Sequence, residues 1–151
     1  MSITIRAATQ TETGSVTACV CHAFIDYIPA IGKQPQPMLD DYQRLIEEGR
    51  VFAAFVEESL VGVLVLSEEA DSLCIETLAT HPRAQGQGIG KALISYAETV
   101  ARSNKAASVW LSTNSLMHHA QQIYHHLGFV VYDRRIVNGY DRIFFRKNLT
   151  A

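Results

Sequence analysis

The stretch from Gln85 to Leu93, QGQGIGKAL, has the composition of an anion-binding loop. Glycines occupy the alternate positions 86, 88 and 90, and apolar residues at helical spacing follow them. Glycine lacks the Cβ atom that keeps a ligand away from the backbone, so successive N–H groups can point toward one anion. The first turn of the following helix adds N–H donors without intrahelical acceptors and the positive end of the helix dipole. We therefore interpret this stretch as a phosphate-binding loop, with Lys91 in the first helical turn.

The spacing of these glycines excludes two familiar phosphate-binding motifs. A P-loop requires G-x-x-x-x-G-K-[ST], but Ala92 follows Gly90-Lys91 and Gln85 occupies the earlier glycine position. The dinucleotide fingerprint G-x-G-x-x-G, counted from Gly86, has Lys91 in place of its third glycine. A flexible turn with a solvated lysine is the alternative interpretation, although turns seldom need three glycines in five residues.

Hydrophobic periodicity predicts the elements that must position this loop. The expected strands are residues 2–8, 51–57, 60–66, 72–80, 108–112, 129–136 and 140–146, and the expected helices are residues 9–27, 38–48, 90–103 and 116–127. The segment YIPAIGKQPQP, which contains three prolines, is expected to be a loop. The resulting order is β-α-α-β-β-β-α-β-α-β-β. Adjacent strands predict antiparallel pairing and the strand-helix-strand unit predicts a parallel step, so the expected fold class is α/β, with a mixed sheet of the α+β kind and helices on both faces.

Length and composition indicate one soluble domain comprising residues 1–151. The chain is 48% hydrophobic and 19% charged, as in an ordinary globular protein. No stretch approaches ~18 uninterrupted apolar residues, and the N-terminus lacks the basic start and apolar run of a signal peptide. We therefore expect a cytoplasmic protein without a membrane partner. Three cysteines do not suggest a disulfide framework, and no basic-aromatic module suggests a nucleic-acid partner.

The glycine loop and its surroundings resemble a known family. The stretch LATHPRAQGQGIGKAL resembles the acyl-CoA-binding motif of the GNAT superfamily of N-acetyltransferases, which is Q/R-x-x-G-x-G/A after a strand. Gln85, Gly88 and Gly90 carry this match. The resemblance extends over nearly the whole chain, because the predicted order of strands and helices is also the order of that superfamily.

A second stretch, LSTNSLMHHAQQIYHHLGF, is similar to the superfamily's second signature, a strand, then a helix with A-x-x-x-Y, then LGF. Ala120, Tyr124 and Leu127-Gly128-Phe129 carry this match. The chain departs from the superfamily at Met117, where many members have an asparagine. Asn114 is the nearby polar residue that is a candidate substitute in anchoring the cofactor arm.

The resemblance implies a GNAT-like acyl-CoA N-acyltransferase fold and the activity of an acetyl-CoA-dependent N-acetyltransferase. Such an enzyme transfers the acetyl group directly to an amine of a small molecule or peptide, through a ternary complex. Acetyl-CoA is the implied co-substrate, no metal is implied, and a homodimer is allowed. The implied cofactor-binding residues are Gln85, Gly86, Gln87, Gly88, Ile89, Gly90 and Lys91 for the pyrophosphate, and Leu78, Ala79 and Thr80 for the pantetheine arm. A non-catalytic acyl-CoA-binding regulatory module is the alternative function.

Direct transfer to an amine requires a base, because only about one lysine-like amine in 2,500 is neutral at pH 7. Glu76, in the strand LCIETLA, is the candidate base, and burial among its apolar neighbours would raise its pKa. The alternative is a strand carboxylate that faces solvent. In some superfamily members the glutamate lies two residues earlier, at the position of Cys74, and strand alternation places Cys74 and Glu76 on the same face.

Tyr124 is the candidate acid for the departing thiolate, because its position matches the superfamily's tyrosine. Its alternative role is core packing, since it belongs to an apolar stripe at helical spacing. The stripe comprises Leu116, Ala120, Ile123, Tyr124 and Leu127. The histidines of the same helix, at 118, 119, 125 and 126, have separations that do not suit one metal ion, so we expect no metal site there.

The charge distribution suggests where the acceptor binds. Residues 1–80 contain 12 acidic and 4 basic side chains, whereas residues 81–151 contain 3 acidic and 9 basic ones. A basic second half suits the polyanionic CoA, and an acidic first half suits a cationic amine. We expect the acceptor at the segment YIPAIGKQPQPMLDDY, with Tyr27, Asp41 and Tyr42 as substrate-binding residues. A solvated acidic surface is the alternative.

Overall fold

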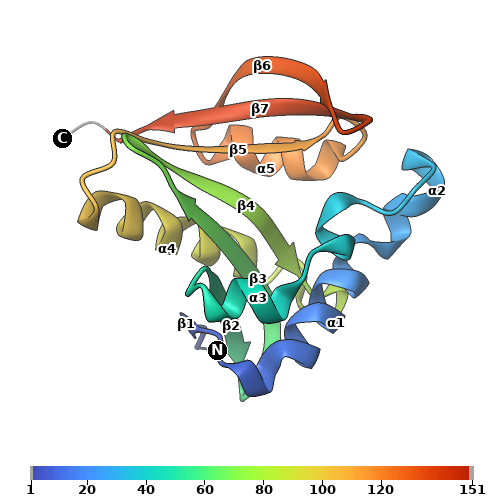
Figure 1. Ribbon diagram of the computed structural model, residues 1–151, viewed down its shortest axis with the longest axis vertical. Helices are drawn as coiled ribbons and strands as arrows, with labels where there is room; N and C mark the ends of the chain where they lie inside the picture. The colour runs from blue at the N-terminus through green and yellow to red at the C-terminus, as the bar shows by residue number, and fades with distance from the viewer. Residues whose placement is uncertain (1, 150–151) are drawn as a thin grey trace. The chain divides into compact units, whose positions relative to one another are not determined.

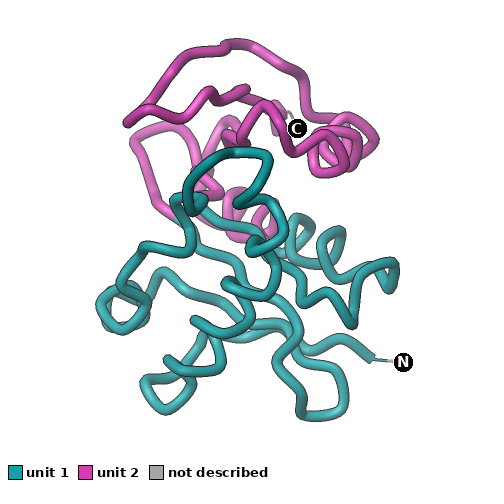
Figure 2. Tube along the Cα trace, turned by 90° about the vertical axis from the view of Figure 1, so that its right-hand side faces the viewer, with its two compact units in different colours: residues 1–66, 77–96 teal, residues 67–76, 97–151 magenta. Residues whose placement is uncertain are grey.

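The computed structural model describes residues 2–149 (Figure 1). The backbone divides into unit 1, residues 1–66 with 77–96, and unit 2, residues 67–76 with 97–151 (Figure 2). Strand β4 (Ser72–Thr80) and helix α4 (Ile89–Ser103) each contribute residues to both units. The assignment of residues 1–151 to a single domain stays a prediction.

Unit 1 contains the antiparallel part of the sheet, in the strand order β1-β2-β3-β4. Strand β1 (Thr4–Ala7) pairs with β2 (Val51–Val56), which pairs with β3 (Ser59–Glu68). Glu57 and Glu58 join β2 to β3 with φ values of 49° and 70°. Positive φ at both central residues is the geometry of the tight hairpin turn that matches the twist of the flanking strands. The antiparallel pairing predicted for these neighbouring strands is therefore confirmed.

The helices of unit 1 are shorter and more numerous than the sequence suggested. Before β2 they are the 3₁₀ turn η1 (Gln10–Glu12), α1 (Thr13–Phe24), η2 (Ile25–Tyr27), α2 (Ile28–Ile31), η3 (Gln36–Leu39) and α3 (Tyr42–Glu47). The prediction of a loop over YIPAIGKQPQP is wrong at α2. Pro29 lies in the first turn of α2, where its missing N–H costs nothing, and Gly32 ends the helix with a φ of +85°.

The core of unit 1 forms where α1 and α3 pack on one face of this sheet. Alternate strand residues point to that face, as the period of two requires. The buried cluster contains Val16, Cys19 and Val20 of α1, Tyr42, Leu45 and Ile46 of α3, and Val51, Ala53, Val63, Val65 and Ala79 of the strands. The first half of α4 lies on the opposite face, where Ile89 and Leu93 approach Gly62.

One helical stretch of unit 1, Gln10–Ile31, is long and apolar enough to cross a membrane by length and composition alone. Soluble core helices meet the same criteria, so this is weak support for a membrane span. Val16, Cys19 and Val20 of this stretch are buried in the core of unit 1. The absence of a membrane partner stays a prediction.

Unit 2 contains the parallel step and the C-terminal hairpin, in the strand order β4-β5-β7-β6. Strand β4 runs parallel to β5 (Ser108–Asn114) from Ser72↔Ser108 to Ile75↔Leu111. Strand β7 (Tyr140–Asn148) is antiparallel to both β5 and β6 (Val130–Val137). The turn between β6 and β7 has positive φ at Asn138 and Gly139, the geometry that an Asn-Gly pair favours in a tight hairpin. The mixed sheet and the α/β class are therefore confirmed.

The two helical segments of unit 2 lie on the same face of its sheet. Phe145 of β7 contacts the rings of Tyr124 and His125 on α5 (His118–His126), with centroid distances of 5.6 and 5.2 Å. Lys147 of β7 donates to Glu98 of α4 on that same face. Because strand residues alternate between faces, Phe144 and Arg146 point the other way. Within the described residues of unit 2, no helix covers that second face.

Candidate functional site

The glycine loop lies in unit 1, between the 3₁₀ turn η4 (Pro82–Ala84) and helix α4. Gly86 and Gly88 have φ values of +79° and +83°, a region that side chains rarely adopt. A Cβ atom added at either position would meet nothing within 4 Å, so the space beside the backbone is open. Both glycines are therefore required by the path of the backbone, which leaves an exposed surface that a ligand can approach.

Gly90 has a different role from the other two glycines. Its φ is not positive, because it belongs to the first turn of α4. A Cβ atom there would lie 3.9 Å from Oγ1 of Thr80, an ordinary van der Waals distance. The fold therefore does not require glycine at position 90.

Helix α4 begins where the glycine loop ends. The N–H of Ala92 donates to the carbonyl of Gly88 at 3.0 Å. The N–H groups that precede it in the first turn have no intrahelical acceptor, as at any helix start, and are available to an anion. Lys91 is exposed in this turn, and no acidic residue accompanies it. Ile89 is fully buried and packs against Gly62 of β3, which fixes the start of α4 to the sheet. The arrangement suits the binding of a phosphate group.

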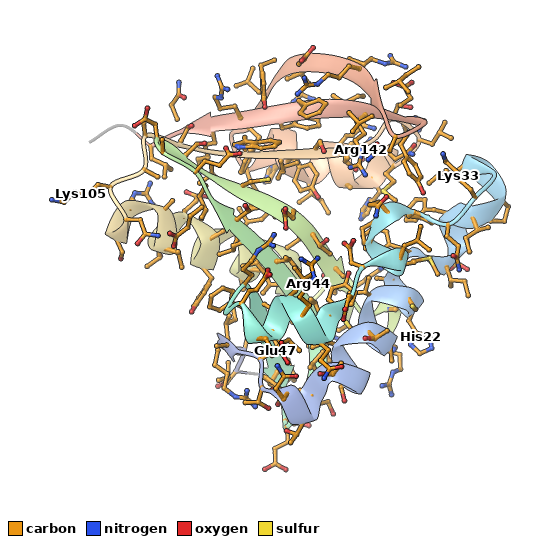
Figure 3. The ribbon with its side chains drawn as sticks, viewed as in Figure 1. His22, Lys33, Arg44, Glu47, Lys105 and Arg142 are labelled. Atoms are coloured by element: carbon orange, nitrogen blue, oxygen red, sulfur yellow. The ribbon has the colours of Figure 1, made fainter. Side chains whose placement is uncertain are left out.

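His81 is the residue before η4, which leads into the glycine loop. Sequence reasoning did not single it out. Its backbone N–H donates to the carbonyl of Val61 at 2.8 Å, and its Nδ1 accepts from the N–H of Arg83 at 3.1 Å. Its ring lies 5.1 Å from that of His22, which Figure 3 shows on α1. Partial burial, followed by Arg83 and His22, lowers the pKa of His81. The position before Pro82, where a helical turn begins, was the available signal in the sequence.

The predicted pantetheine-binding residues are the last residues of β4 in unit 1. The ladder between β4 and β5 ends at Ile75↔Leu111, so Leu78, Ala79 and Thr80 lie beyond it along β4. Ala79 is buried in the core beneath α1 and α3, whereas Leu78 and Thr80 are half-buried. Their contact with a cofactor stays a prediction.

Glu76 lies on β4 in unit 2, and its side chain is exposed. The expectation that apolar neighbours would bury this carboxylate is wrong. Cys74, two residues earlier, is buried, so two residues on the same face of β4 differ in their surroundings. The physical reason is that alternation assigns a residue to a face, but what packs on that face decides its burial. The role of Glu76 as a base stays a prediction.

Tyr124 packs in the core of unit 2. It is 7% exposed, and its ring lies 5.6 Å from Phe145 and 6.2 Å from Phe129. The apolar stripe predicted for this helix is thus only partly buried, since Leu116 and Ile123 are exposed. Tyr124 has a packing role in unit 2, and the acid role of its hydroxyl stays a prediction.

Asn114 shapes the turn between β5 and α5. Its side-chain Oδ1 accepts from the N–H of Leu116 at 3.0 Å, and its carbonyl accepts from the N–H of Met117 at 3.0 Å. Gln121 secures the same turn by donating to the carbonyls of Asn114 and Ser115, at 3.3 and 3.0 Å. Sequence reasoning missed Gln121, because a glutamine on a helix carries no signal of a contact with the preceding turn. Asn114 as a cofactor anchor stays a prediction.

The predicted acceptor residues of unit 1 have structural roles. Tyr42 is 2% exposed, its hydroxyl donates to the carbonyl of Pro37 at 2.6 Å, and burial raises its pKa. Asp41 caps α3 by accepting from the N–H of Arg44 at 3.2 Å. Tyr27 is half-buried, with its ring 6.4 Å from that of Phe24. The burial of Tyr42 leaves little of its side chain exposed to a ligand, and the substrate-binding role of the three residues stays a prediction.

The histidines of α5 at positions 118, 119, 125 and 126 are all exposed. Among residues 2–149, no group of three or more His, Cys, Asp or Glu side chains is arranged to hold a metal ion.

Comparison with known proteins connects this architecture to one family. The model of the acetyltransferase (GNAT) family matches residues 20–129. No curated protein sequence matches the chain. Among solved structures, PaiA N-acetyltransferase from Thermoplasma acidophilum, in complex with coenzyme A, is similar over 99% of this chain and 100% of its own, with a TM-score of 0.83 and 18% identity.

Two further solved structures show the same fold. The ribosomal-protein-S18-alanine N-acetyltransferase from Escherichia coli matches 99% of this chain and 97% of its own, with a TM-score of 0.78 and 16% identity. The yncA structure from Salmonella typhimurium, with its cofactor acetyl-CoA, matches 100% of this chain and 96% of its own, with a TM-score of 0.77 and 19% identity. At such identities, these likenesses show the fold alone.

Proposed function

This chain belongs to the GNAT family of acetyltransferases, and from that premise we propose that it transfers an acetyl group from acetyl-CoA directly to the amine of a small molecule or peptide. Direct transfer means that acetyl-CoA and the acceptor bind together, with no acetylated enzyme between them. The membership covers residues 20–129, which include the glycine loop and helix α5.

The observation that supports this proposal most strongly is the geometry of the glycine loop. Gly86 and Gly88 adopt positive φ directly before a 15-residue helix, and the space beside them is open. The backbone of Gln85, Gly86, Gln87, Gly88, Ile89 and Gly90 would hold the pyrophosphate, assisted by the dipole of α4 and by Lys91. The two neighbours solved with coenzyme A or acetyl-CoA support CoA as the ligand.

The remaining cofactor contacts would come from β4. Leu78, Ala79 and Thr80 would pair through their backbone with the amides of the pantetheine arm, as an added strand does. Asn114 would assist from the turn after β5. Acetyl-CoA would supply the activated acetyl group, and no metal takes part in the proposed reaction.

Two side chains would move protons in the transfer. Glu76 would accept a proton from the acceptor amine, directly or through a water molecule, which is consistent with its exposed carboxylate. Tyr124 would donate its hydroxyl proton to the departing thiolate of CoA. The carbonyl oxygen of the acetyl group gains charge during the attack, so it would require a backbone N–H donor.

The acceptor would be a small-molecule or peptide amine. The fold accommodates acetylation of a protein amine in the S18-alanine N-acetyltransferase from Escherichia coli, which supports a peptide acceptor as one option. Tyr27 and Asp41 remain substrate-binding candidates, while the burial of Tyr42 favours a supporting role for that residue. A cytoplasmic location and a homodimer belong to the same proposal.

Calorimetric titration with acetyl-CoA, with ATP and NADH as controls, is the first test of this proposal. We expect binding of acetyl-CoA and no binding of either control. A second test measures release of CoA thiol in the presence of a panel of amines. Tight binding without release for any amine would favour a non-catalytic acyl-CoA-binding module, and absence of acetyl-CoA binding would contradict the function altogether.

A further inference from the structure

Arginine and aromatic side chains gather on the face of the unit 2 sheet on which the described residues of that unit place no helix. Strand registers assign its members, because residues directly opposite each other in a ladder share a face. Trp110 lies opposite Arg146, Ser112 opposite Phe144, and Asn114 opposite Arg142. We call this face, with Tyr132, Asp133 and Arg135 of β6, the arginine face.

Arginines on this face stack on aromatic rings. The guanidinium of Arg146 lies 4.2 Å from the centroid of Tyr132, and that of Arg135 lies 4.3 Å from the centroid of Phe144. Phe144 is 4% exposed, and Trp110, Tyr132 and Arg135 contact its ring. Stacking holds each guanidinium in a fixed orientation and leaves its N–H edge able to bind an oxyanion.

Two of these arginines lie directly opposite each other. The register of β6 and β7 pairs Arg135 with Arg142. Like charges at directly opposite positions of an antiparallel ladder destabilise it. Asp133 offsets part of this repulsion, at 3.5 Å from Nε of Arg135, and Arg142 donates to Oγ of Ser112 at 3.2 Å. An anion bound between the two guanidinium groups would attract both of them and so offset their mutual repulsion.

The net charge of the arginine face indicates which kind of anion it would bind. The face carries three arginines, Arg135, Arg142 and Arg146, together with the carboxylate of Asp133. Glu76 belongs to the same face, because it follows Cys74 by two residues and Cys74 pairs with Trp110. The small net positive charge suits one carboxylate better than a phosphate dianion.

We propose that the acceptor amine carries a carboxylate, which Arg135 and Arg142 bind on the arginine face. The inference rests on the proposed function, since it names the acceptor of the same reaction. It departs from the simple cationic amine that the acidic first half of the sequence suggested. Glu76, the proposed base for the amine, lies on the same sheet face as this carboxylate site. One face of the sheet would therefore bind the carboxylate of the acceptor and take the proton from its amine.

The kinetic test compares each of the twenty amino acids with its own amide as acceptor, by release of CoA thiol. The amide has the more acidic ammonium group and is therefore richer in neutral amine, so a preference for the acid must come from its carboxylate. We expect the acid to be preferred. In Arg135→Gln and Arg142→Gln, kcat/KM for the acid should fall about tenfold or more, as for the loss of a charged hydrogen bond, and kcat/KM for the amide should hardly change.

Arg134→Gln is the matched control. Arg134 neighbours Arg135 on β6 but lies on the opposite face, where it pairs with Asp141 at 2.7 Å. We expect it to leave the acid-to-amide ratio unchanged. Equal use of acids and amides, preference for a polyamine, or an equal effect of all three variants would overturn the inference while leaving the acetyltransferase activity in place.

A binding test separates this inference from the proposed function. The Nε–H signals of the arginines are followed by NMR while N-acetylphenylalanine, its amide or inorganic phosphate is added to the protein without CoA. Shifts at Arg135 and Arg142 with the carboxylate alone would support the site even if no amine released CoA. No shift, or equal shifts with inorganic phosphate, would overturn it even if CoA were released.

Discussion

The Cβ atom that Gly62 lacks would lie 2.7 Å from Cγ2 of Ile89. Strand β3 and the first residue of α4 therefore approach so closely that only a glycine fits between them. Cδ1 of Leu93 at 3.0 Å and Cβ of Ala54 at 3.2 Å close the same space. Ile89 is a β-branched residue directly after the glycine loop, so its side chain cannot easily move aside. The position of the loop thus depends on a glycine that lies far from it in the sequence.

Gly62→Ala should destabilise the protein by about 1–3 kcal/mol, the usual cost of overpacking a buried site. It should also weaken acetyl-CoA binding, because the start of α4 must shift. Urea unfolding and calorimetric titration measure the two effects. Gly14→Ala is the control, since a Cβ atom at Gly14 would meet nothing within 4 Å in helix α1. It should be neutral or stabilise by up to about 1 kcal/mol, and an equal loss in both variants would contradict the packing argument.

Alanine substitutions in the glycine loop should separate backbone strain from ligand contact. Gly86→Ala and Gly88→Ala force a side chain into positive φ, so each should destabilise the fold by about 1–3 kcal/mol or rearrange the loop, and should weaken acetyl-CoA binding. Gly90→Ala should not destabilise the fold, because its Cβ atom has room beside Thr80. If Gly90→Ala weakens acetyl-CoA binding at unchanged stability, the ligand itself approaches that residue. Equal stabilities of all three variants would contradict this assignment of strain.

His81 should make stability depend on pH near neutrality. Its pKa is lower in the folded than in the unfolded chain, so between the two values the unfolded chain binds more protons. Its contribution should therefore be complete above about pH 6.5 and should decline as the pH falls through the folded pKa. Protonation would also remove the acceptor that Nδ1 offers to Arg83.

His81→Asn should keep an acceptor at this capping position and remove the titrating group. Urea unfolding from about pH 7.5 to about pH 5.5 is measured for both proteins. We expect the difference in the free energy of unfolding between wild type and variant to change across this range. A constant difference would show that His81 does not titrate as inferred.

Tyr124→Phe should lower kcat about 100-fold or more if the hydroxyl protonates the thiolate of CoA. The phenylalanine ring keeps the contacts with Phe129 and Phe145, so stability should change little. Tyr96→Phe is the control, because the Tyr96 ring packs on Phe52 at 5.1 Å and its hydroxyl has no assigned role. Wild-type turnover by Tyr124→Phe would exclude the acid role.

Glu76→Gln should lower kcat/KM about 100-fold and remove the acidic limb of its pH profile, if Glu76 is the base. Binding of acetyl-CoA should be unaffected, since the loop proposed to hold the pyrophosphate belongs to unit 1. Glu47→Gln, an exposed carboxylate on α3, is the control (Figure 3). An unchanged pH profile in Glu76→Gln would mean that another group, or bulk water, takes the proton.

Local chemistry made most of the fold predictable from the sequence. The strands after Gly49 and the helix after the glycine loop have clear periods of two and of 3.6 residues, and their observed bounds agree within a few residues. An Asn-Gly pair between two strands favours a hairpin turn, and a glycine after a helix favours its end; Asn138, Gly139 and Gly128 have the positive φ that these roles require. These features depend on neighbouring residues alone.

The errors have two different causes, one local and one tertiary. Helix α2 forms in a proline-rich stretch because Pro29 falls in the first turn of the helix and Gly32 ends it. The exposure of Glu76, although apolar residues flank it, depends instead on the tertiary structure. Periodicity reports which face of an element a residue occupies, but it does not report what covers that face.

The sequence by itself determined the family motifs and the order of the strands, since each follows from residue type and short-range spacing, while the anion-binding role of the glycine loop stays a prediction. Only the tertiary structure decided that Gly62 limits the approach of α4, that His22 lies beside His81, and that Arg135 lies opposite Arg142. The reason is physical: strand register and helix packing join residues that are far apart in the chain, and many sequences with the same local pattern could join them differently.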